Sequence, residues 1–192
     1  MAKSSAWWAL AAAWCILAPV AARAEEKGGM QHMAPMTDAQ MIESAMKAAP
    51  AAVAKDATVI AMNDDRSIRE VRKGSNGFTC MADNPETPGP DPMCADGNAM
   101  GWIQAWLGKQ TPATDKVGLM YMLAGGTDAS NTDPYATKPT AENHWVSTGP
   151  HLMVVGAPSL LTAYPKSADP DTSNPYVMWA GTPYEHLMIP VK

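Results

Sequence analysis

The run Val117-Gly118-Leu119-Met120-Tyr121-Met122-Leu123-Ala124 has the length and the apolar composition of a buried β-strand. Segments rich in Pro, Asp, Asn and Ser lie on both sides of it and are typical of long loops. Further strands are predicted at residues 58–62, 67–72, 77–81, 151–155, 176–180 and 186–191. This succession of strands and loops predicts a mainly antiparallel sheet.

Two helices are predicted beside this sheet. Thr37-Asp38 precedes apolar side chains at helical spacing within residues 41–46, and Pro50 ends or kinks that helix. Asp96 is the predicted N-cap of a second helix, which ends at Gly108. The fold class that follows is α+β, with a mainly antiparallel sheet, both helices on one face and long Pro/Asp/Asn-rich loops.

The N-terminus has the three parts of a secretory signal peptide. Lys3 gives a positive start, residues 6–20 form an apolar block, and Ala22-Arg23-Ala24 is a small-x-small cleavage site. The block is shorter than the about 20 apolar residues of a membrane span, and Pro19 interrupts it. We therefore expect residues 1–24 to be removed, which predicts a periplasmic or secreted protein.

Two further segments follow the predicted signal peptide. Residues 25–36 are polar and rich in Met and Gly, as expected of a flexible N-terminal segment, and residues 37–192 have the length of a single α+β domain. Without Lys3 and Arg23, 12 basic residues face 19 acidic ones, and the net charge is −7. An acidic chain without a basic run argues against nucleic acid and against anionic membrane surfaces as partners.

Cys80 and Cys94 are the two cysteines that remain after signal removal. They are 14 residues apart and flank a Pro-rich stretch. An oxidising compartment favours a structural disulfide between them, whereas a redox dithiol is typically spaced C-x-x-C.

The C-terminal half contains a degenerate internal duplication. Met122-Leu123-Ala124-Gly125-Gly126-Thr127 resembles Met178-Trp179-Ala180-Gly181-Thr182, and His151-Leu152-Met153-Val154 resembles His186-Leu187-Met188-Ile189. The irregular spacing excludes a solenoid, whose repeats have a fixed period. Two similar hairpins, each with a turn at the Gly-Thr sequence, are the simplest interpretation.

Two groups of methionine and histidine residues indicate a soft metal such as copper. On a strand, His151 and Met153 share a face, and so do His186 and Met188, because side chains alternate with a period of two. Imidazole and thioether together suit Cu(I). The sequence therefore predicts a site in which both His-x-Met pairs converge. A second, independent candidate site lies in the N-terminal segment and consists of Met30, His32, Met33 and Met36.

Other interpretations of the same residues remain open. Methionine also fills gaps in hydrophobic cores. A dispersed triad would combine His144, His151 or His186 with a serine and with Asp128 or Asp133. Asp169-x-Asp171-x-Ser173 resembles the start of a calcium loop but lacks the later ligands.

Four segments carry a resemblance to known proteins: Gly77-Phe78-Thr79-Cys80-Met81, Pro88-Gly89-Pro90-Asp91-Pro92-Met93-Cys94, residues 125–135 and residues 176–191. They resemble a group of small exported bacterial proteins with no known activity, over most of residues 25–192. The resemblance implies export and a single domain, and it brings no activity, cofactor or catalytic residue with it.

The sequence as a whole predicts an exported, soluble domain that binds a ligand rather than catalyses a reaction. Copper bound through Met and His is the most specific hypothesis. The alternatives are a hydrolase or carbohydrate-active enzyme, and a structural or interaction domain of the cell envelope.

Overall fold

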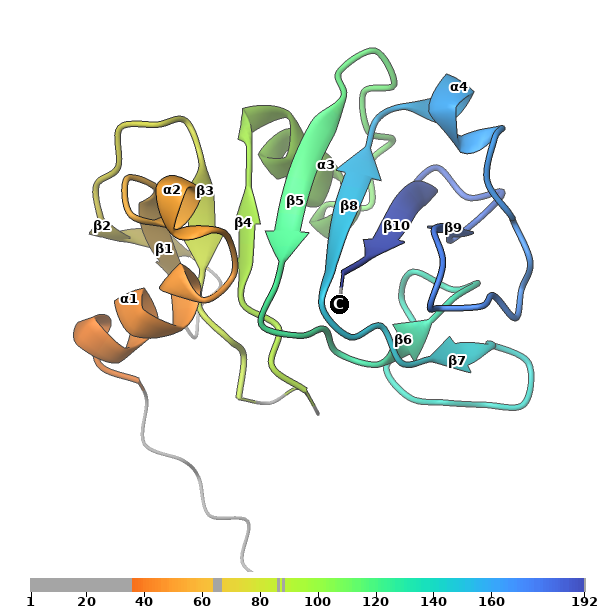
Figure 1. Ribbon diagram of the computed structural model, residues 1–192, viewed down its shortest axis with the longest axis horizontal. Helices are drawn as coiled ribbons and strands as arrows, with labels where there is room; N and C mark the ends of the chain where they lie inside the picture. Colours follow the sequence, from red (N-terminus) through yellow and green to blue (C-terminus); the bar gives the residue numbers. More distant parts are fainter. Residues whose placement is uncertain (1–35, 64–66, 86, 88, 192) are drawn as a thin grey trace, which may run out of the picture. The chain divides into compact units, whose positions relative to one another are not determined.

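The computed structural model describes residues 36–63, 67–85, 87 and 89–191, all within one compact unit, Met33–Lys192 (Figure 1). Its helices are α1 (Asp38–Met46), α2 (Ala51–Ala54), α3 (Gly97–Leu107) and α4 (Pro158–Leu161). Its strands are β1 (Thr58–Met62), β2 (Ile68–Arg72), β3 (Thr79–Met81), β4 (Met93–Ala95), β5 (Gly118–Met122), β6 (Ala129–Ser130), β7 (Trp145–Val146), β8 (His151–Val155), β9 (Tyr176–Met178) and β10 (His186–Pro190). The predicted signal peptide lies outside the described residues.

Eight strands form one sheet in the order β2-β1-β3-β4-β5-β8-β10-β9 (Figure 1). Among the pairings of the described residues, only β1 with β3 is parallel. The predicted α+β class with a mainly antiparallel sheet is therefore confirmed. The strands β6 and β7 pair separately as a second, two-stranded sheet.

The predicted start signals of both longer helices are present. Thr37 caps α1 and forms a capping box with Gln40, in which each side chain accepts a hydrogen bond from the other residue's backbone. The Asp96 side chain accepts a bond of 2.8 Å from the Ala99 backbone N–H and so caps α3, and Gly108 ends that helix. These helices begin where polar side chains satisfy the first free N–H groups.

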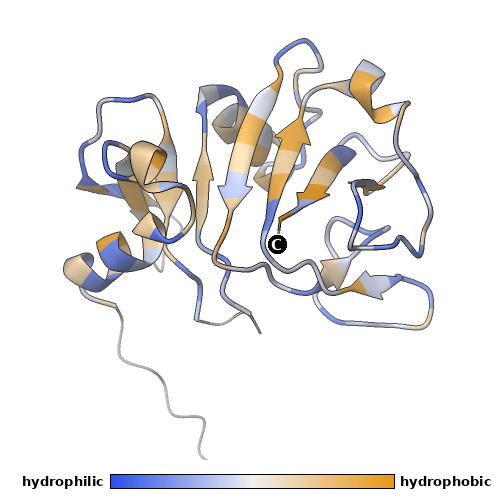
Figure 2. Cartoon of the chain, in the orientation of Figure 1, coloured by the Kyte–Doolittle hydropathy of each residue, from blue (hydrophilic) through white to orange (hydrophobic). Residues whose placement is uncertain are grey.

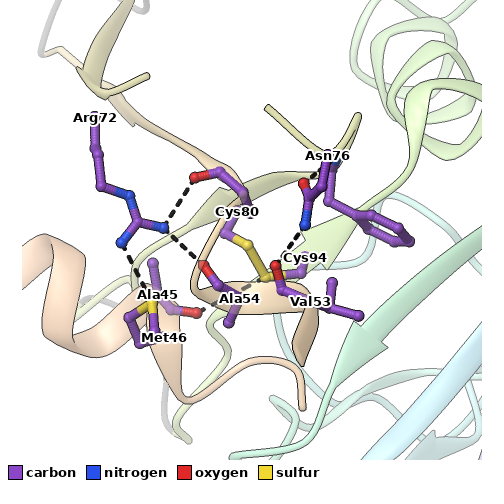
Figure 3. The surroundings of a disulfide bond; sticks show 10 residues. Ala45, Met46, Val53, Ala54, Arg72, Asn76, Cys80 and Cys94 are labelled. Atoms are coloured by element: carbon purple, nitrogen blue, oxygen red, sulfur yellow. Dashed lines mark hydrogen bonds between the residues drawn. A yellow bond between two sulfur atoms is a disulfide. The ribbon is translucent and has the colours of Figure 1, made fainter. Parts of the chain in front are cut away.

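The disulfide joins Cys80 and Cys94, which lie directly opposite each other on β3 and β4. Both are buried in a cluster with small side chains from α1 and α2. Figure 3 shows Arg72 beside it, where the guanidinium donates to the carbonyls of Ala54 at 2.7 Å and Ala57 at 2.9 Å. The predicted disulfide is confirmed, and it ties the strands beneath α1 and α2 together.

The helices cover both faces of the sheet, which corrects the prediction that they share one face. Cys94 and Tyr121 point to the face under α1 and α2, whereas their neighbours Ala95 and Met120 pack with Trp102 and other side chains of α3 on the other face. The sheet is hydrophobic on both sides because the apolar runs are nearly continuous, as in β8 and β10 (Figure 2). A sheet buried on two faces needs cover on both.

Three strands and two helices have no counterpart among the elements that the sequence predicts. The strand β4 lies next to the Pro-rich stretch, and β6 and β7 have only two residues each, too few to show a periodicity. The helices α2 and α4 have four residues each. Among the described residues, no helix has the length and apolar character needed to cross a membrane.

Candidate functional site

The internal duplication corresponds to two antiparallel strand pairs in the sheet, β5 with β8 and β9 with β10. The predicted pair of similar hairpins is found only for β9 and β10, because β6 and β7 lie between β5 and β8 in the chain. In the first strand pair, Met122 at the end of β5 lies opposite His151 at the start of β8. In the other, Met178 at the end of β9 lies opposite His186 at the start of β10. Each histidine therefore has one methionine directly across from it and another two residues further along its own strand.

The register places the two histidines of the predicted four-ligand site at opposite ends of the sheet face, because each begins its strand and the two strands are antiparallel. The strands β8 and β10 are antiparallel neighbours, with Met153 opposite Met188 and His151 opposite Pro190. This register separates His151 from His186 by four residues along the sheet, or about 13 Å at the usual rise of a strand. Two ligands of one metal ion lie within about 4 Å of each other. The register thus brings Met153 and Met188 together and sets the backbones of the two histidines apart.

His186 is the most unusual polar group of the sheet. It is completely buried, and its Nδ1 lies 2.9 Å from the carbonyl oxygen of Tyr184. Because a carbonyl only accepts, Nδ1 carries the proton and Nε2 carries a lone pair. That Nε2 atom has no hydrogen-bond partner. A buried polar atom without a partner is rare in folded proteins and calls for an explanation, such as a bound water or ion.

The surroundings of His186 hold its imidazole in the neutral form. Burial lowers its pKa to about 4, and repulsion from His151 acts in the same direction, against the bond to Tyr184. Two indole rings enclose the imidazole: its centroid lies 4.9 Å from that of Trp179 and 5.3 Å from that of Trp102, and both rings are nearly perpendicular to it. At neutral pH the nitrogen lone pair is therefore free.

The thioethers nearest to His186 along the sheet are those of Met178 and Met188. Met178 is its cross-strand partner, and Met188 follows it on the same face. All three belong to one face, and both methionines are at most 3 % exposed. Sequence reasoning identifies Met188 but misses Met178 as a neighbour of His186. The match between Met122 and Met178 in the duplication is the signal that points to it.

A small pocket lies beside Trp102, whose ring contacts His186. It has a volume of about 130 Å³. Its wall includes Trp102 and Glu185, the first of which contacts the His186 ring and the second of which precedes it in the chain. Trp102 is thus the residue that both lines the pocket and contacts the imidazole ring.

Two other buried polar atoms without partners belong to the same region. The Tyr176 hydroxyl is one, and Tyr176 lies opposite Met188 in the sheet. Burial raises its pKa to about 12, so it stays protonated. The other is Oδ1 of Asn131. The backbone carbonyl of Asn131 accepts a hydrogen bond from the backbone N–H of Trp179 at 2.9 Å. Among the described residues, the buried side-chain polar atoms without a partner are thus those of His186, Tyr176 and Asn131, close to β9.

One histidine of the predicted triad, His144, pairs with a carboxylate other than the two predicted for that triad. His144 Nδ1 lies 2.7 Å from the Asp169 carboxylate, and neither Asp128 nor Asp133 takes that place. His144 also has a positive φ of 46°, which is uncommon for a residue with a side chain. The hydroxyl of Ser130, the buried serine nearby, donates to the Asn143 carbonyl at 2.6 Å. Ser130 thus uses its hydroxyl proton in this bond and does not donate it to His144.

The remaining metal candidates are not assembled by the described residues. Met30, His32 and Met33 lie outside the described residues, and Met36 is half-buried at their start. Asp171 uses its carboxylate to bond Ser173 and Asn174 in a turn, as at an ordinary Asx turn. Within the described chain, no three His, Cys, Asp or Glu side chains gather in a way that suits a metal ion.

Comparisons with protein-family models, with curated proteins and with solved structures found no match to this chain.

Proposed function

We propose that this protein is an exported soft-metal-binding protein, and that it binds Cu(I) through Nε2 of His186 and the thioethers of Met178 and Met188. The observation that carries the proposal is the lone pair of His186, buried and without a partner, on a methionine-rich sheet face. Thioether and imidazole ligands select Cu(I) among the common metal ions.

The hydrogen bond at the other ring nitrogen of His186 supports this role. A histidine that binds metal usually donates its other ring N–H to a carbonyl or carboxylate, which fixes the tautomer and the ring orientation. The Tyr184 carbonyl provides that bond at 2.9 Å. The imidazole needs no deprotonation above its pKa of about 4, so a metal does not compete with a proton at neutral pH.

The low charge of Cu(I) suits a buried, neutral site. Burying an ion costs less when its charge is small and when polar or polarisable groups surround it. The indole rings of Trp102 and Trp179 pack around the imidazole, and an aromatic face attracts a nearby cation. Carboxylate ligands, which a hard divalent cation needs, do not group here among the described residues.

Export is part of the proposal. The predicted signal peptide and the disulfide between Cys80 and Cys94 both fit an oxidising compartment. In such a compartment thioethers remain ligands for Cu(I) while cysteines are held in disulfides.

A titration with Ag(I), a redox-inert substitute for Cu(I), tests the proposal. The fluorescence of Trp102 and Trp179 reports binding next to His186. We expect Met178→Leu/Met188→Leu to weaken this response at least about tenfold, because Leu keeps the volume and removes both thioether ligands. Met120→Leu is the matched control, since Met120 is equally buried on the same face but lies on β5.

The proposal is contradicted if the double variant binds Ag(I) as tightly as the wild-type protein. It is also contradicted if His186→Phe, which keeps an aromatic ring but has no lone pair, leaves the fluorescence response unchanged.

Hydrolysis is a second candidate function, favoured by the bond of 2.7 Å between His144 and Asp169. A carboxylate that orients an imidazole is the arrangement of a general base. A panel of chromogenic esters and glycosides would test it. If hydrolysis is found, His144→Gln should lower its rate about 100-fold or more; an equal rate in the variant excludes this role.

A further inference from the structure

The opposite end of the same sheet face repeats the arrangement around His186. His151 has Met122 directly opposite and Met153 two residues along its own strand. Its Nδ1 lies 2.7 Å from the Gly149 carbonyl, two residues before it, just as Nδ1 of His186 contacts the carbonyl two residues before it. The bond fixes the same tautomer, so Nε2 of His151 also carries the lone pair.

The His151 ring is held in place by the two loops beside it. A Cβ atom at Gly126 would collide with the Thr148 hydroxyl and would lie 2.9 Å from Cε1 of the imidazole. The Thr148 hydroxyl in turn donates to the Thr127 carbonyl at 3.0 Å. The His151 ring itself bonds the Gly149 carbonyl through Nδ1. The bond through Nδ1 therefore orients the ring and leaves the lone pair on Nε2.

A row of methionines leads from His151 across the sheet towards its more exposed part. Met122 is opposite His151, and Met81 is opposite Met93 on the next two strands. Continuing the register of β4 and β5 by one residue places Met93 opposite Met122. Cross-strand neighbours of this kind have Cβ atoms about 5 Å apart, within reach of flexible methionine side chains.

Exposure decreases along this row. Met81 and Met93 are half-buried, Met122 is 7 % exposed and His151 is 3 % exposed. Both outer methionines pack against the same core cluster that contains the inner ones. The thioethers of this row therefore become more buried from Met81 to Met122, and the imidazole of His151 follows them. In the part of the chain that the structure describes, no indole rings enclose His151 as they enclose His186.

We propose that His151, Met122 and Met93 form a second soft-metal site, which takes Cu(I) or Ag(I), and that Met81 is its outermost thioether. This inference rests on the proposed function for the kind of metal ion that is bound, whereas the residues that bind it are different ones. Because its methionines are more exposed than those around His186, this second site exchanges its ion faster.

Nitrogen NMR of the ¹⁵N-labelled imidazoles tests the two sites separately, because each has its own histidine. With two equivalents of Ag(I), the Nε2 signals of both His151 and His186 should move towards the values of coordinated nitrogen. In Met93→Leu/Met122→Leu, the His151 shift should be lost while the His186 shift remains. In Met178→Leu/Met188→Leu, the His186 shift should be lost while the His151 shift remains. Met120→Leu should retain both shifts. Single His151→Phe and His186→Phe variants assign the signals.

The outcomes of this experiment separate the second site from the proposed function. A shift of His186 alone in the wild-type protein overturns the second site and leaves the first. A shift of His151 alone supports the second site and overturns the first. If neither signal moves, both are wrong. A His151 shift that survives Met93→Leu/Met122→Leu contradicts the assignment of Met93 and Met122 as ligands.

Discussion

Met153 and Met188 lie directly opposite each other on β8 and β10. The pair of Met122 and His151 lies at one end of this sheet face, and the pair of Met178 and His186 lies at the other end. One pair joins β5 to β8 and the other joins β9 to β10, so the four strands form two similar halves. Because the inner strands are antiparallel, equivalent residues of the halves fall at opposite ends of the sheet face. The duplication therefore yields two separate histidine positions rather than one.

Ag(I) should raise the thermal stability of the wild-type protein. A ligand that binds only the folded state adds about 2.7 kcal/mol at a free concentration 100 times its Kd. Calorimetry should show this increase in Tm for Met120→Leu as well. In Met178→Leu/Met188→Leu the increase should be smaller, whereas the Tm without metal should change little because Leu and Met have similar volumes. An equal increase in the double variant would argue that the ion binds elsewhere.

Acid should destabilise the folded protein through His186. The unfolded chain takes up a proton on this residue near pH 6.5, but the folded protein does so only near pH 4, because burial lowers the pKa. Between these values the unfolded state binds more protons, so the free energy of unfolding falls as the pH falls. Above pH 6.5 the titration of His186 no longer changes the free energy of unfolding. At pH 4 this free energy is lower by about 3 kcal/mol because of His186.

Urea unfolding at pH 7.5 and pH 4.5 measures this effect. We expect His186→Phe to show a smaller difference between the two pH values than the wild-type protein. Met188→Leu, which keeps the imidazole and its bond to Tyr184, should show the full difference. His151, whose pKa is also lowered by burial, contributes in the same direction in all three proteins.

Loss of the disulfide should destabilise the domain. Cys80 and Cys94 close a loop with a sequence separation of 14, for which the chain-entropy model gives about 3 kcal/mol. Urea unfolding of Cys80→Ala/Cys94→Ala should show a loss of this order relative to the oxidised wild-type protein. Dithiothreitol should destabilise the wild-type protein and leave the double variant unchanged. A similar effect of the reductant on both proteins would point to a cause other than this bond.

Gly126→Ala should destabilise the protein by about 1–3 kcal/mol, because the added methyl group collides with Thr148 and the His151 ring. Gly101→Ala is the matched control. Gly101 lies within α3, and a Cβ there meets nothing within 4 Å, so Ala should stabilise the helix by up to about 1 kcal/mol. Thermal unfolding compares the two. A loss of stability in Gly101→Ala, or none in Gly126→Ala, would contradict this assignment.

Much of the fold could be predicted because its signals are local. Thr37 and Asp96 cap helices through residues three positions away, and the apolar runs at 118–122 and 151–155 are long enough to identify strands. Very short elements such as β6 and β7 have no such signal. The face on which each helix packs also has none, since it depends on which strands become neighbours.

The sequence by itself determined the pairing of Cys80 with Cys94 and the sharing of one face by each histidine and the methionine two residues after it. Both follow from chain proximity and from the alternation of side chains along a strand. Only the tertiary structure decided that β8 and β10 run antiparallel with Met153 opposite Met188. Strand order and register arise from contacts between distant segments, and they moved the two histidines apart and gave each of them a new methionine neighbour.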